Sequence, residues 1–334
     1  MDWRADYRAF TYHGGALEVA RQLAPDAPKP WIDLSTGINP HAYPLPNLGT
    51  EAWSRLPENG ALAKLEAAAA LRYGAAATSV VAGPGSQALI QALSHILPHG
   101  AIGALAPTYG GFASAFAVDA RVIEAERLED MGALDVAIVV NPNNPDGRVT
   151  PRAALLDLHA RLAPHAGVLI VDEAFADLDG EESLAPSLPT SRAVVLRSFG
   201  KAYGLAGLRL GFALASSDIV SSLRAALGPW PVSGPAIAIG FRALADWDWL
   251  EATRARLGAD AARFDALLHE AGWRTIGGTR LFRLAAHAEA RLAFERLLAA
   301  GILARPFSTH ADWLRFGIPG KENAWERLAV ALRG

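Results

Sequence analysis

Short apolar segments alternate with Ala- and Leu-rich helical segments through the middle of the chain, and this alternation constrains the fold more than any other feature. Unbroken apolar strands separated by helices are typical of a mostly parallel sheet covered by helices on both faces. We therefore expect a large α/β domain of three layers, α/β/α. Its strands are predicted at 79–82, 101–106, 121–124, 136–140, 168–171, 193–197 and 210–215, and its helices at 61–73, 86–96, 109–116 and 151–162.

The two ends of the chain have a different texture. Residues 1–50 are irregular, with a short helix predicted at 16–23 and a strand at 31–34, and we interpret them as an N-terminal arm. The large domain would span 51–234, and a smaller C-terminal α/β domain would span 235–334. In this last part, helices are predicted at 236–245, 248–271 and 322–332, and strands near 281–284, 302–305 and 313–317.

Composition excludes several classes of protein. Lys and Arg number 31 against 34 Asp and Glu, and 51% of the residues are hydrophobic, which argues against a disordered chain and a broad nucleic-acid surface. The absence of cysteine rules out disulfides, thiolate metal sites and a cysteine nucleophile. No apolar run reaches the ~18 residues of a membrane span. The first ten residues lack the apolar region of a signal peptide, so a cytoplasmic protein is expected. The nine histidines are scattered, and no metal site is expected.

Polar residues follow the predicted strands of the large domain at the points where those strands end. In open α/β sheets, ligands bind beyond the carboxyl ends of the strands. Five strand ends carry residues that can contact a ligand, which predicts a binding site at this edge of the sheet. They are Gly85-Ser86-Gln87, Tyr109, Asn141 to Asn144, Asp172, and Ser198 with Lys201.

The segment at 85–87 opens a helix, so its free backbone N–H groups favour a phosphate, although it could equally be a plain turn with a capping serine. Residues 83–88 also match the dinucleotide pattern GxGxxA, which requires an acidic residue about 20 positions further on. The next strand ends at Ala106-Pro107-Thr108 without an acid, and the lysine of a phosphate-binding Walker loop is absent. Nicotinamide binding is therefore disfavoured.

Asp172 ends an apolar strand, and a buried carboxylate needs a partner, which could be a salt bridge, a helix cap or a protonated ring nitrogen. Lys201 could be a surface charge. Arg209 lies eight residues after it and opens an apolar strand, so Ser198 and Arg209 could hold a phosphate beside a lysine that forms a Schiff base.

Six segments in this order resemble the fold-type-I pyridoxal-phosphate enzymes of the aspartate aminotransferase superfamily. They are GPGSQ, PTYGGF, NPNNPDGR, VDEAFADL, SFGKAYGLAGLRLGF and LRFGIPGKENAWERL. The chain is similar to the branch that holds histidinol-phosphate aminotransferases and the threonine-phosphate decarboxylases of cobalamin biosynthesis. In the arm, His13-Gly14-Gly15, residues 31–40 and residues 53–57 resemble the decarboxylases more.

The resemblance implies a role for each matching residue. Lys201 would bind pyridoxal 5′-phosphate and act as the catalytic acid and base. Asp172 would keep the pyridine nitrogen protonated, Asn144 would bond the ring 3′-oxygen, and Tyr109 would stack on the ring. The cofactor phosphate would be bound by Gly85, Ser86, Gln87, Ser198 and Arg209. The substrate would be bound by Arg315, with Arg305, His13, Gly37 and Asn39 as further candidates.

Two residues depart from the family pattern. Phe175 replaces a frequent tyrosine, which removes one hydroxyl contact to the cofactor. Leu56 stands where many aminotransferases place a tyrosine that reaches the partner subunit's site. The resemblance still implies a homodimer.

The resemblance favours decarboxylation of L-threonine O-3-phosphate to (R)-1-amino-2-propanol O-2-phosphate. An aminotransferase of the histidinol-phosphate type is the alternative, because the choice depends on how the substrate is oriented. A cofactor-binding module without catalysis is a third possibility, although the chain carries no basic DNA-binding extension.

Overall fold

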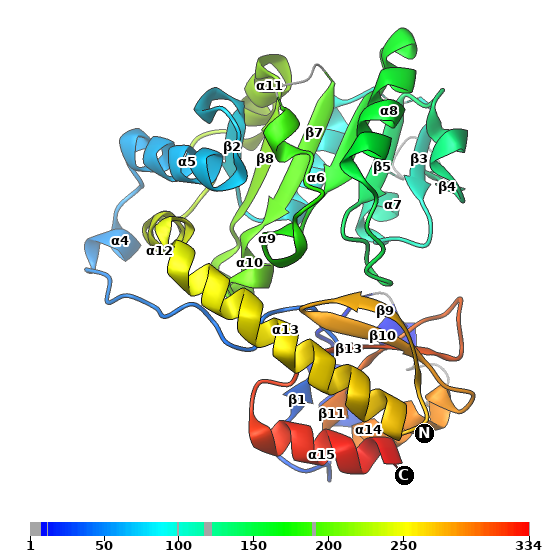
Figure 1. Cartoon of the computed structure of the whole chain (residues 1–334). Helices are drawn as coiled ribbons and strands as arrows, with labels where there is room; N and C mark the ends of the chain where they lie inside the picture. The colour runs from blue at the N-terminus through cyan, green and yellow to red at the C-terminus, as the bar shows by residue number, and fades with distance from the viewer. Residues whose placement is uncertain (1–7, 12, 99, 117–121, 189–191, 334) are drawn as a thin grey trace. The chain divides into compact units, whose positions relative to one another are not determined.

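A computed structural model describes residues 8–11, 13–98, 100–116, 122–188 and 192–333 (Figure 1). Residues 1–7, which bear on the signal-peptide expectation, and Arg121, the first residue of a predicted strand, lie outside these ranges. The chain folds as two compact units. The large unit consists of Ala42–Asn144 and Arg148–Glu251, and the small unit consists of the described residues up to His41, Pro145–Gly147 and the residues from Ala252 onward.

The large unit is built on a sheet of seven strands in the order β2-β8-β7-β6-β5-β3-β4. The five strands from β7 to β4 run parallel, whereas β8 is antiparallel to both β2 and β7. The prediction of a mostly parallel sheet is therefore confirmed. The strands are β2 (Val80–Gly83), β3 (Ile102–Leu105), β4 (Val122–Ala125), β5 (Val136–Val140), β6 (Val168–Asp172), β7 (Ala193–Ser198) and β8 (Gly211–Ala215).

Helices cover both faces of this sheet, as Figure 1 shows with α8 in front of the strands and α6 behind them. On one face, Leu89, Phe112 and Leu223 pack against buried strand residues such as Ile138 and Val194. The helices of this face are α6 (Ser86–Ile96), α7 (Gly111–Phe116) and α11 (Ser217–Leu227). The other helices of the unit are α4 (Glu51–Ser54), α5 (Asn59–Tyr73), α8 (Arg152–Leu162), α9 (Ala176–Asp179), α10 (Phe199–Ala202) and α12 (Gly234–Ala245).

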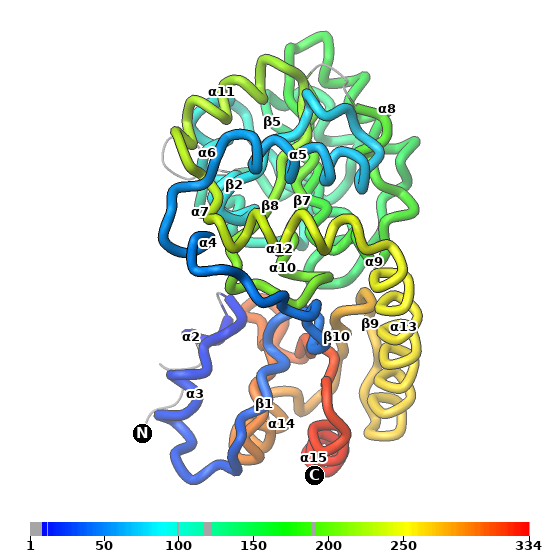
Figure 2. The backbone as a smooth tube through the Cα atoms, turned by 90° about the vertical axis from the view of Figure 1, so that its left-hand side faces the viewer, coloured from blue at the N-terminus to red at the C-terminus, as the bar shows by residue number. Residues whose placement is uncertain are grey.

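Capping residues set where two of the longer helices end and begin. Gly74 follows α5 in the left-handed conformation, with φ of 68°, and its N–H bonds the carbonyl groups of Ala70 and Leu71. Ser233 precedes α12, and its side chain accepts a hydrogen bond from the N–H of Ala236. Helices α5 and α12 lie side by side (Figure 2).

The small unit contains a four-stranded antiparallel sheet in the order β12-β13-β10-β9 and a two-stranded parallel sheet of β1 and β11. Helix α13 (Trp247–Glu270) begins in the large unit and continues into the small one. The other elements are α2 (Arg8–Thr11), α3 (Leu17–Leu23), β1 (Ile32–Asp33), β9 (Arg274–Thr279), β10 (Phe282–Ala286), α14 (Ala290–Ala299), β11 (Ile302–Leu303), β12 (Arg305–Pro306), β13 (Trp313–Gly317) and α15 (Glu322–Arg333).

The segment predicted as one strand at 302–305 differs in the structure. Ile302 and Leu303 pair with β1, whereas Arg305 and Pro306 pair with β13 in the other sheet. The chain changes sheets at Ala304, because the first two residues pair with β1 and the next two pair with β13. None of the described helices is long and apolar enough to cross a membrane.

Candidate active site

A cavity of about 180 Å³ lies in the large unit at the carboxyl ends of β5, β6 and β7. The parallel register places Val140 beside Asp172 and Asp172 beside Leu196, so the ends of these strands meet at one edge. All the residues that the sequence assigns to the cofactor line this cavity. They are Gly85, Ser86, Gln87, Tyr109, Asn144, Asp172, Ser198, Lys201 and Arg209. The structure thus brings them together, and the role of each stays a prediction.

The part of the cavity around the start of α6 has groups that favour an anion such as a phosphate. Ser86 begins the eleven-residue helix α6, whose first N–H groups and dipole favour an anion. Gly85 has φ of 92°, and a Cβ atom there would meet the Arg209 guanidinium at 2.8 Å. A Cβ at Gly211 would collide with the backbone nitrogen of Ser86. These glycines therefore let the backbone and Arg209 approach closely around the start of α6.

Asp172 is the acidic group of the cavity and is 4% exposed. Burial raises its pKa to about 6, while the N–H of Ala174 and the charge of Lys201 act in the opposite direction. The N–H of Ala174 donates to the Asp172 carboxylate at 3.1 Å. A buried carboxyl group of this kind is strongly stabilised by a cation within the cavity. A protonated pyridine nitrogen supplies such a charge, so the donor set fits pyridoxal phosphate.

Tyr109 and Phe175 provide the aromatic walls of the cavity. The Tyr109 hydroxyl donates a hydrogen bond to the side-chain oxygen of Gln87 at 2.9 Å, which holds the Tyr109 ring in place. The Phe175 ring lies 5.7 Å from the Lys201 amine. The hydrogen bond from Tyr109 shows that Gln87 also positions the Tyr109 ring. The sequence did not suggest this contact, because the motif that contains Gln87 indicates only phosphate binding.

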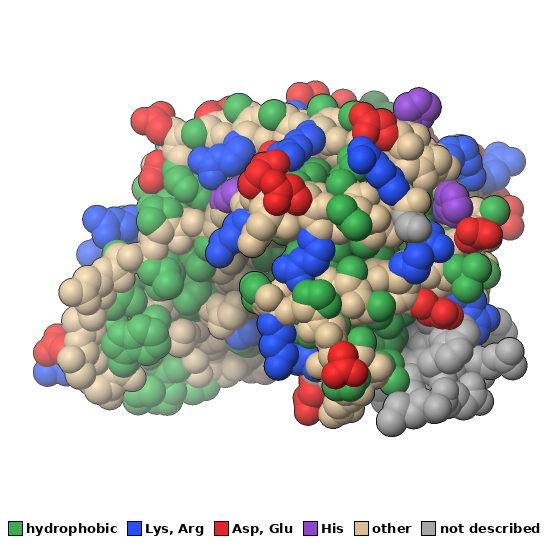
Figure 3. Space-filling view, turned by 90° about the horizontal axis from the view of Figure 1, so that it is seen from below, with side chains coloured by type: hydrophobic (Ala, Val, Ile, Leu, Met, Phe, Trp, Pro, Cys, Tyr) green, Lys and Arg blue, Asp and Glu red, His purple; other side chains and the backbone are tan. Residues whose placement is uncertain are grey.

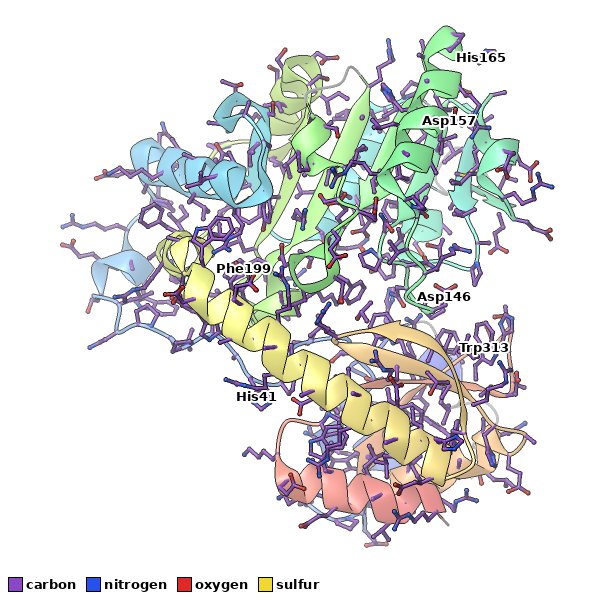
Figure 4. All side chains as sticks on the ribbon, viewed as in Figure 1. His41, Asp146, Asp157, His165, Phe199 and Trp313 are labelled. Atoms are coloured by element: carbon purple, nitrogen blue, oxygen red, sulfur yellow. The ribbon has the colours of Figure 1, made fainter. Side chains whose placement is uncertain are left out.

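Lys201 belongs to the four-residue helix α10, which an aromatic stack supports. Phe199, labelled in Figure 4, stacks on Tyr203 with ring centroids 4.3 Å apart. Tyr203 stacks in turn on Trp249 at 5.5 Å. Tyr203 is fully buried, and burial raises the pKa of its hydroxyl far above the usual range. A helix as short as α10 would be unstable alone. The aromatic stack therefore holds it in place next to Lys201.

The five predicted substrate residues belong to the small unit. Arg305 and Arg315 lie opposite each other on β12 and β13 and are 8% and 3% exposed. Burial and the charge of Arg305 lower the pKa of Arg315 well below its usual range, and Asp33 acts in the opposite direction. Arg315 donates to the carbonyl oxygen of Ser35 at 2.8 Å. Two buried guanidinium groups that repel each other favour the binding of an anion.

The arm segments predicted for the substrate lie around the same arginine. The Ser35 hydroxyl accepts from the N–H of Gly15 at 2.7 Å, and Gly14 lies so close to the Ser35 carbonyl that a Cβ has no room. This places the His13-Gly14-Gly15 turn beside the residue that Arg315 binds. Gly37 and Asn39 are buried two and four residues further along, and Asn39 accepts a hydrogen bond from the N–H of His41 at 2.9 Å.

The model of the family described as aminotransferase class I and II matches residues 29–332. The chain belongs to this family. It is 44% identical to a threonine-phosphate decarboxylase of Pseudomonas aeruginosa, with 96% of the chain and 97% of the relative covered. The chain is also 43% identical to a threonine-phosphate decarboxylase of a Sinorhizobium species, and the match covers 96% of the chain and 97% of the relative.

The fold of the family is also seen in a histidinol-phosphate aminotransferase of Sinorhizobium meliloti, solved in complex with pyridoxal 5′-phosphate. Its TM-score is 0.83 at 20% identity, covering 95% of this chain and 93% of the other. Among the described residues, no group of three or more His, Asp or Glu side chains could hold a metal ion.

Proposed function

We propose that the chain catalyses the pyridoxal-phosphate-dependent decarboxylation of L-threonine O-3-phosphate to (R)-1-amino-2-propanol O-2-phosphate in cobalamin biosynthesis. The observation that carries this proposal is the 44% identity to a threonine-phosphate decarboxylase over 96% of the chain. The cavity of the large unit supports it with a lysine, a buried carboxyl group and a phosphate-binding helix start.

Pyridoxal phosphate, when bound, supplies an electron sink that weakens the bonds to the substrate Cα. In this proposal Lys201 binds the cofactor through Nζ and returns a proton to Cα after CO₂ has left. Asp172 keeps a proton on the pyridine nitrogen. Burial raises the pKa of this carboxyl group to about 6, and the positive charge of the ring nitrogen would lower it again, so the ionised carboxylate is the form that pairs with the ring. Gly85, Ser86, Gln87, Ser198 and Arg209 bind the phosphate, and Asn144 binds the ring oxygen.

The substrate carries a carboxylate and a phosphate, and we assign its anions to Arg305 and Arg315. The orientation of the substrate decides the reaction, because only the Cα bond held perpendicular to the ring is weakened. Arginine forms paired hydrogen bonds with both kinds of anion and therefore fixes orientation better than a lysine does. His13, Gly37 and Asn39 are assigned to the same anions from the arm.

The purified protein, loaded with pyridoxal phosphate and given threonine phosphate, is expected to release one CO₂ for each substrate consumed. Lys201→Ala is the matched control, and it should lose both the visible absorbance of the bound cofactor and CO₂ release. An unchanged absorbance spectrum in Lys201→Ala would show that the lysine assignment is wrong.

A histidinol-phosphate type of aminotransferase is the alternative, because such an enzyme shares the fold of this chain and the fold does not distinguish the two reactions. Amino-group transfer from histidinol phosphate to 2-oxoglutarate without CO₂ would establish it in place of the decarboxylase. A bound cofactor whose absorbance no amino acid changes would instead favour a non-catalytic binding module.

We also propose that the chain forms a homodimer through an apolar surface of the large unit. Around α4 and α12, Trp53 is 69% exposed, Leu56 66% and Phe241 46%. Phe241 also lines an apolar groove with Pro57, Ala61, Ile237 and Ala238. Figure 3 shows hydrophobic side chains gathered on the side of α4. Exposed apolar surface of this kind is typical of an interface between subunits.

We further place the protein in the cytoplasm. The absence of cysteine is compatible with a reducing compartment, and a small phosphorylated substrate is found there. Fractionation of the cells that make the protein tests this assignment, and recovery in an extracellular or periplasmic fraction would overturn it.

A further inference from the structure

A cluster of buried charges lies beside the cavity and has no part in the reaction described above. Arg197 forms one ion pair with Glu173 at 2.8 Å and a second with Asp177 at 3.2 Å. The side chains of all three are at most 5% exposed. The Ser183 hydroxyl joins the cluster by donating to Glu173 at 2.6 Å and accepting from Arg197 at 2.8 Å. The N–H of Leu184 donates to the other Glu173 oxygen at 2.6 Å.

The cluster is joined directly to two of the predicted cofactor contacts. Glu173 follows Asp172 at the end of β6, and Arg197 precedes Ser198 at the end of β7. Neighbouring residues of a strand point to opposite faces, so Asp172 and Ser198 face the cavity while Glu173 and Arg197 face the other side of the sheet. The ion pair therefore connects the two strand ends behind the cavity. The N–H of Glu173 also bonds the carbonyl of Leu196 at 2.9 Å.

Burial of these charges is not explained by stability alone. Removing ions from water costs several kcal/mol each, and apolar substitutes for a buried pair are often as stable. Here one guanidinium serves two carboxylates, and a hydroxyl and a backbone N–H bind the two oxygens of Glu173. Such a network admits only a narrow range of separations between the groups, which is useful where strand ends must be held in one geometry.

We propose that the buried Glu173–Arg197 pair, closed by Ser183 and Asp177, is a positioning element that fixes Asp172 and Ser198 at the spacing that pyridoxal phosphate requires. Asp172 would contact the ring nitrogen and Ser198 the phosphate, at opposite ends of one rigid molecule. A shift of β6 against β7 would therefore weaken one contact whenever the other is made. This proposal rests on the cofactor assignment of the proposed function but not on which reaction follows.

The test measures binding of pyridoxine 5′-phosphate, which has the ring and the phosphate but no aldehyde to react with Lys201. Tryptophan fluorescence or calorimetry on the full-length apoprotein gives its dissociation constant. Arg197→Met is expected to weaken binding about tenfold or more, because a displacement of about 1 Å is enough to cost enzymes about a hundredfold in rate and should also weaken two contacts that must be made together. Ser183→Ala, which removes only the hydroxyl, should weaken binding by a smaller factor. Glu129→Gln, in an exposed pair with Arg127, should leave it unchanged.

A triple variant separates positioning from stability. Glu173→Gln, Asp177→Asn and Arg197→Met together remove every charge of the cluster, so no unpaired charge is left buried and the triple variant should be more stable to heat than Arg197→Met alone. The proposal expects this variant to bind pyridoxine phosphate more weakly although it is folded. Binding equal to that of the original protein would overturn the proposal.

Two further results keep the outcomes distinct. If Arg197→Met or the triple variant does not fold, Ser183→Ala decides, and unchanged binding in that variant overturns the proposal. If the original protein itself does not bind pyridoxine phosphate, the cofactor assignment fails and not the positioning pair alone. Pyridoxine without phosphate is the second probe, because a pair that aligns both contacts should matter less to a ligand that can make only one of them.

Discussion

Burial of Asp172 makes the ionised form of its carboxyl group unfavourable in the absence of a bound cationic ligand. Its pKa rises from 3.8 to about 6 because the carboxyl group is buried. Between these two pH values the unfolded chain loses its proton while the folded chain keeps it. The stability of the apoprotein is therefore expected to fall as the pH rises through this range.

Asp172→Asn removes this cost, because the amide does not ionise and its oxygen can still accept from the N–H of Ala174. The rise from 3.8 to about 6 corresponds to about 3 kcal/mol at neutral pH. Urea unfolding of the apoproteins should show the variant to be more stable at pH 7.5 and equal to the original protein near pH 4. An Asp172→Asn variant that is less stable than the original protein at pH 7.5 would contradict the raised pKa of Asp172. The variant should also lose activity, because its side chain cannot carry the negative charge that pairs with the ring nitrogen.

The hydrogen bond from Tyr109 to Gln87 makes a second prediction at this scale. Gln87→Ala removes this hydrogen bond, and about 1 kcal/mol of stability is expected to be lost. Because Tyr109 is predicted to stack on the cofactor, the near-ultraviolet and visible circular dichroism of the loaded protein should change as well. Gln91→Ala, at an exposed position of the same helix, is the control and should alter neither.

At the scale of elements, the start of α6 depends on a residue without a side chain. Gly85→Ala forces a Cβ atom onto a φ of 92° and against Arg209. The strain is expected to cost about 1–2 kcal/mol and to displace Arg209, so phosphate affinity should fall. Gly207→Ala has open space around its Cβ and is the matched control. Equal affinities for pyridoxine phosphate in both variants would show that the close approach is unnecessary.

Elements were predictable from the sequence where burial makes every side chain apolar. Strand β5 is Val-Ala-Ile-Val-Val and buried throughout, so its range followed directly from the pattern. Strand β9 was not expected, because its sequence Arg-Thr-Ile-Gly-Gly-Thr is mostly polar or glycine. Side chains at Gly277 and Gly278 would collide with the carbonyl groups of Asp146 and Phe282. The glycines of this strand therefore allow neighbouring backbone to pack closely against it. The alternation of apolar and polar residues along the sequence does not show such a requirement.

The residues of the cofactor cavity were predictable for a related reason. They follow strand ends, where polar residues interrupt apolar runs, and parallel register then brings them together. The Glu173–Arg197 pair was not singled out. A charge at 197 within an otherwise apolar strand was the available signal, but its partner is 24 positions away, and only the structure shows which acid it meets.

At the scale of the whole molecule, the proposed dimer makes a prediction that does not involve the reaction. Phe241→Glu places a charge in the apolar groove formed with Pro57 and Ile237 and should shift the protein towards monomers. Analytical ultracentrifugation at several concentrations measures this. Leu71→Glu, on α5 and also exposed, is a control for the added charge. An original protein that is monomeric at micromolar concentration would overturn the dimer.

The pairing of β1 with β11 affects the order in which parts of the structure can form during synthesis. Ile32 and Asp33 lie beside Ile302 and Leu303, so the first of these segments leaves the ribosome long before its partner has been synthesised. Arg315 likewise binds Ser35 across 280 positions. The large unit has all its residues once Glu251 has been synthesised, whereas the arginines proposed to bind the substrate and the arm segment around them meet only afterwards. A nascent chain can therefore present a finished cofactor cavity well before it has any means of choosing a substrate.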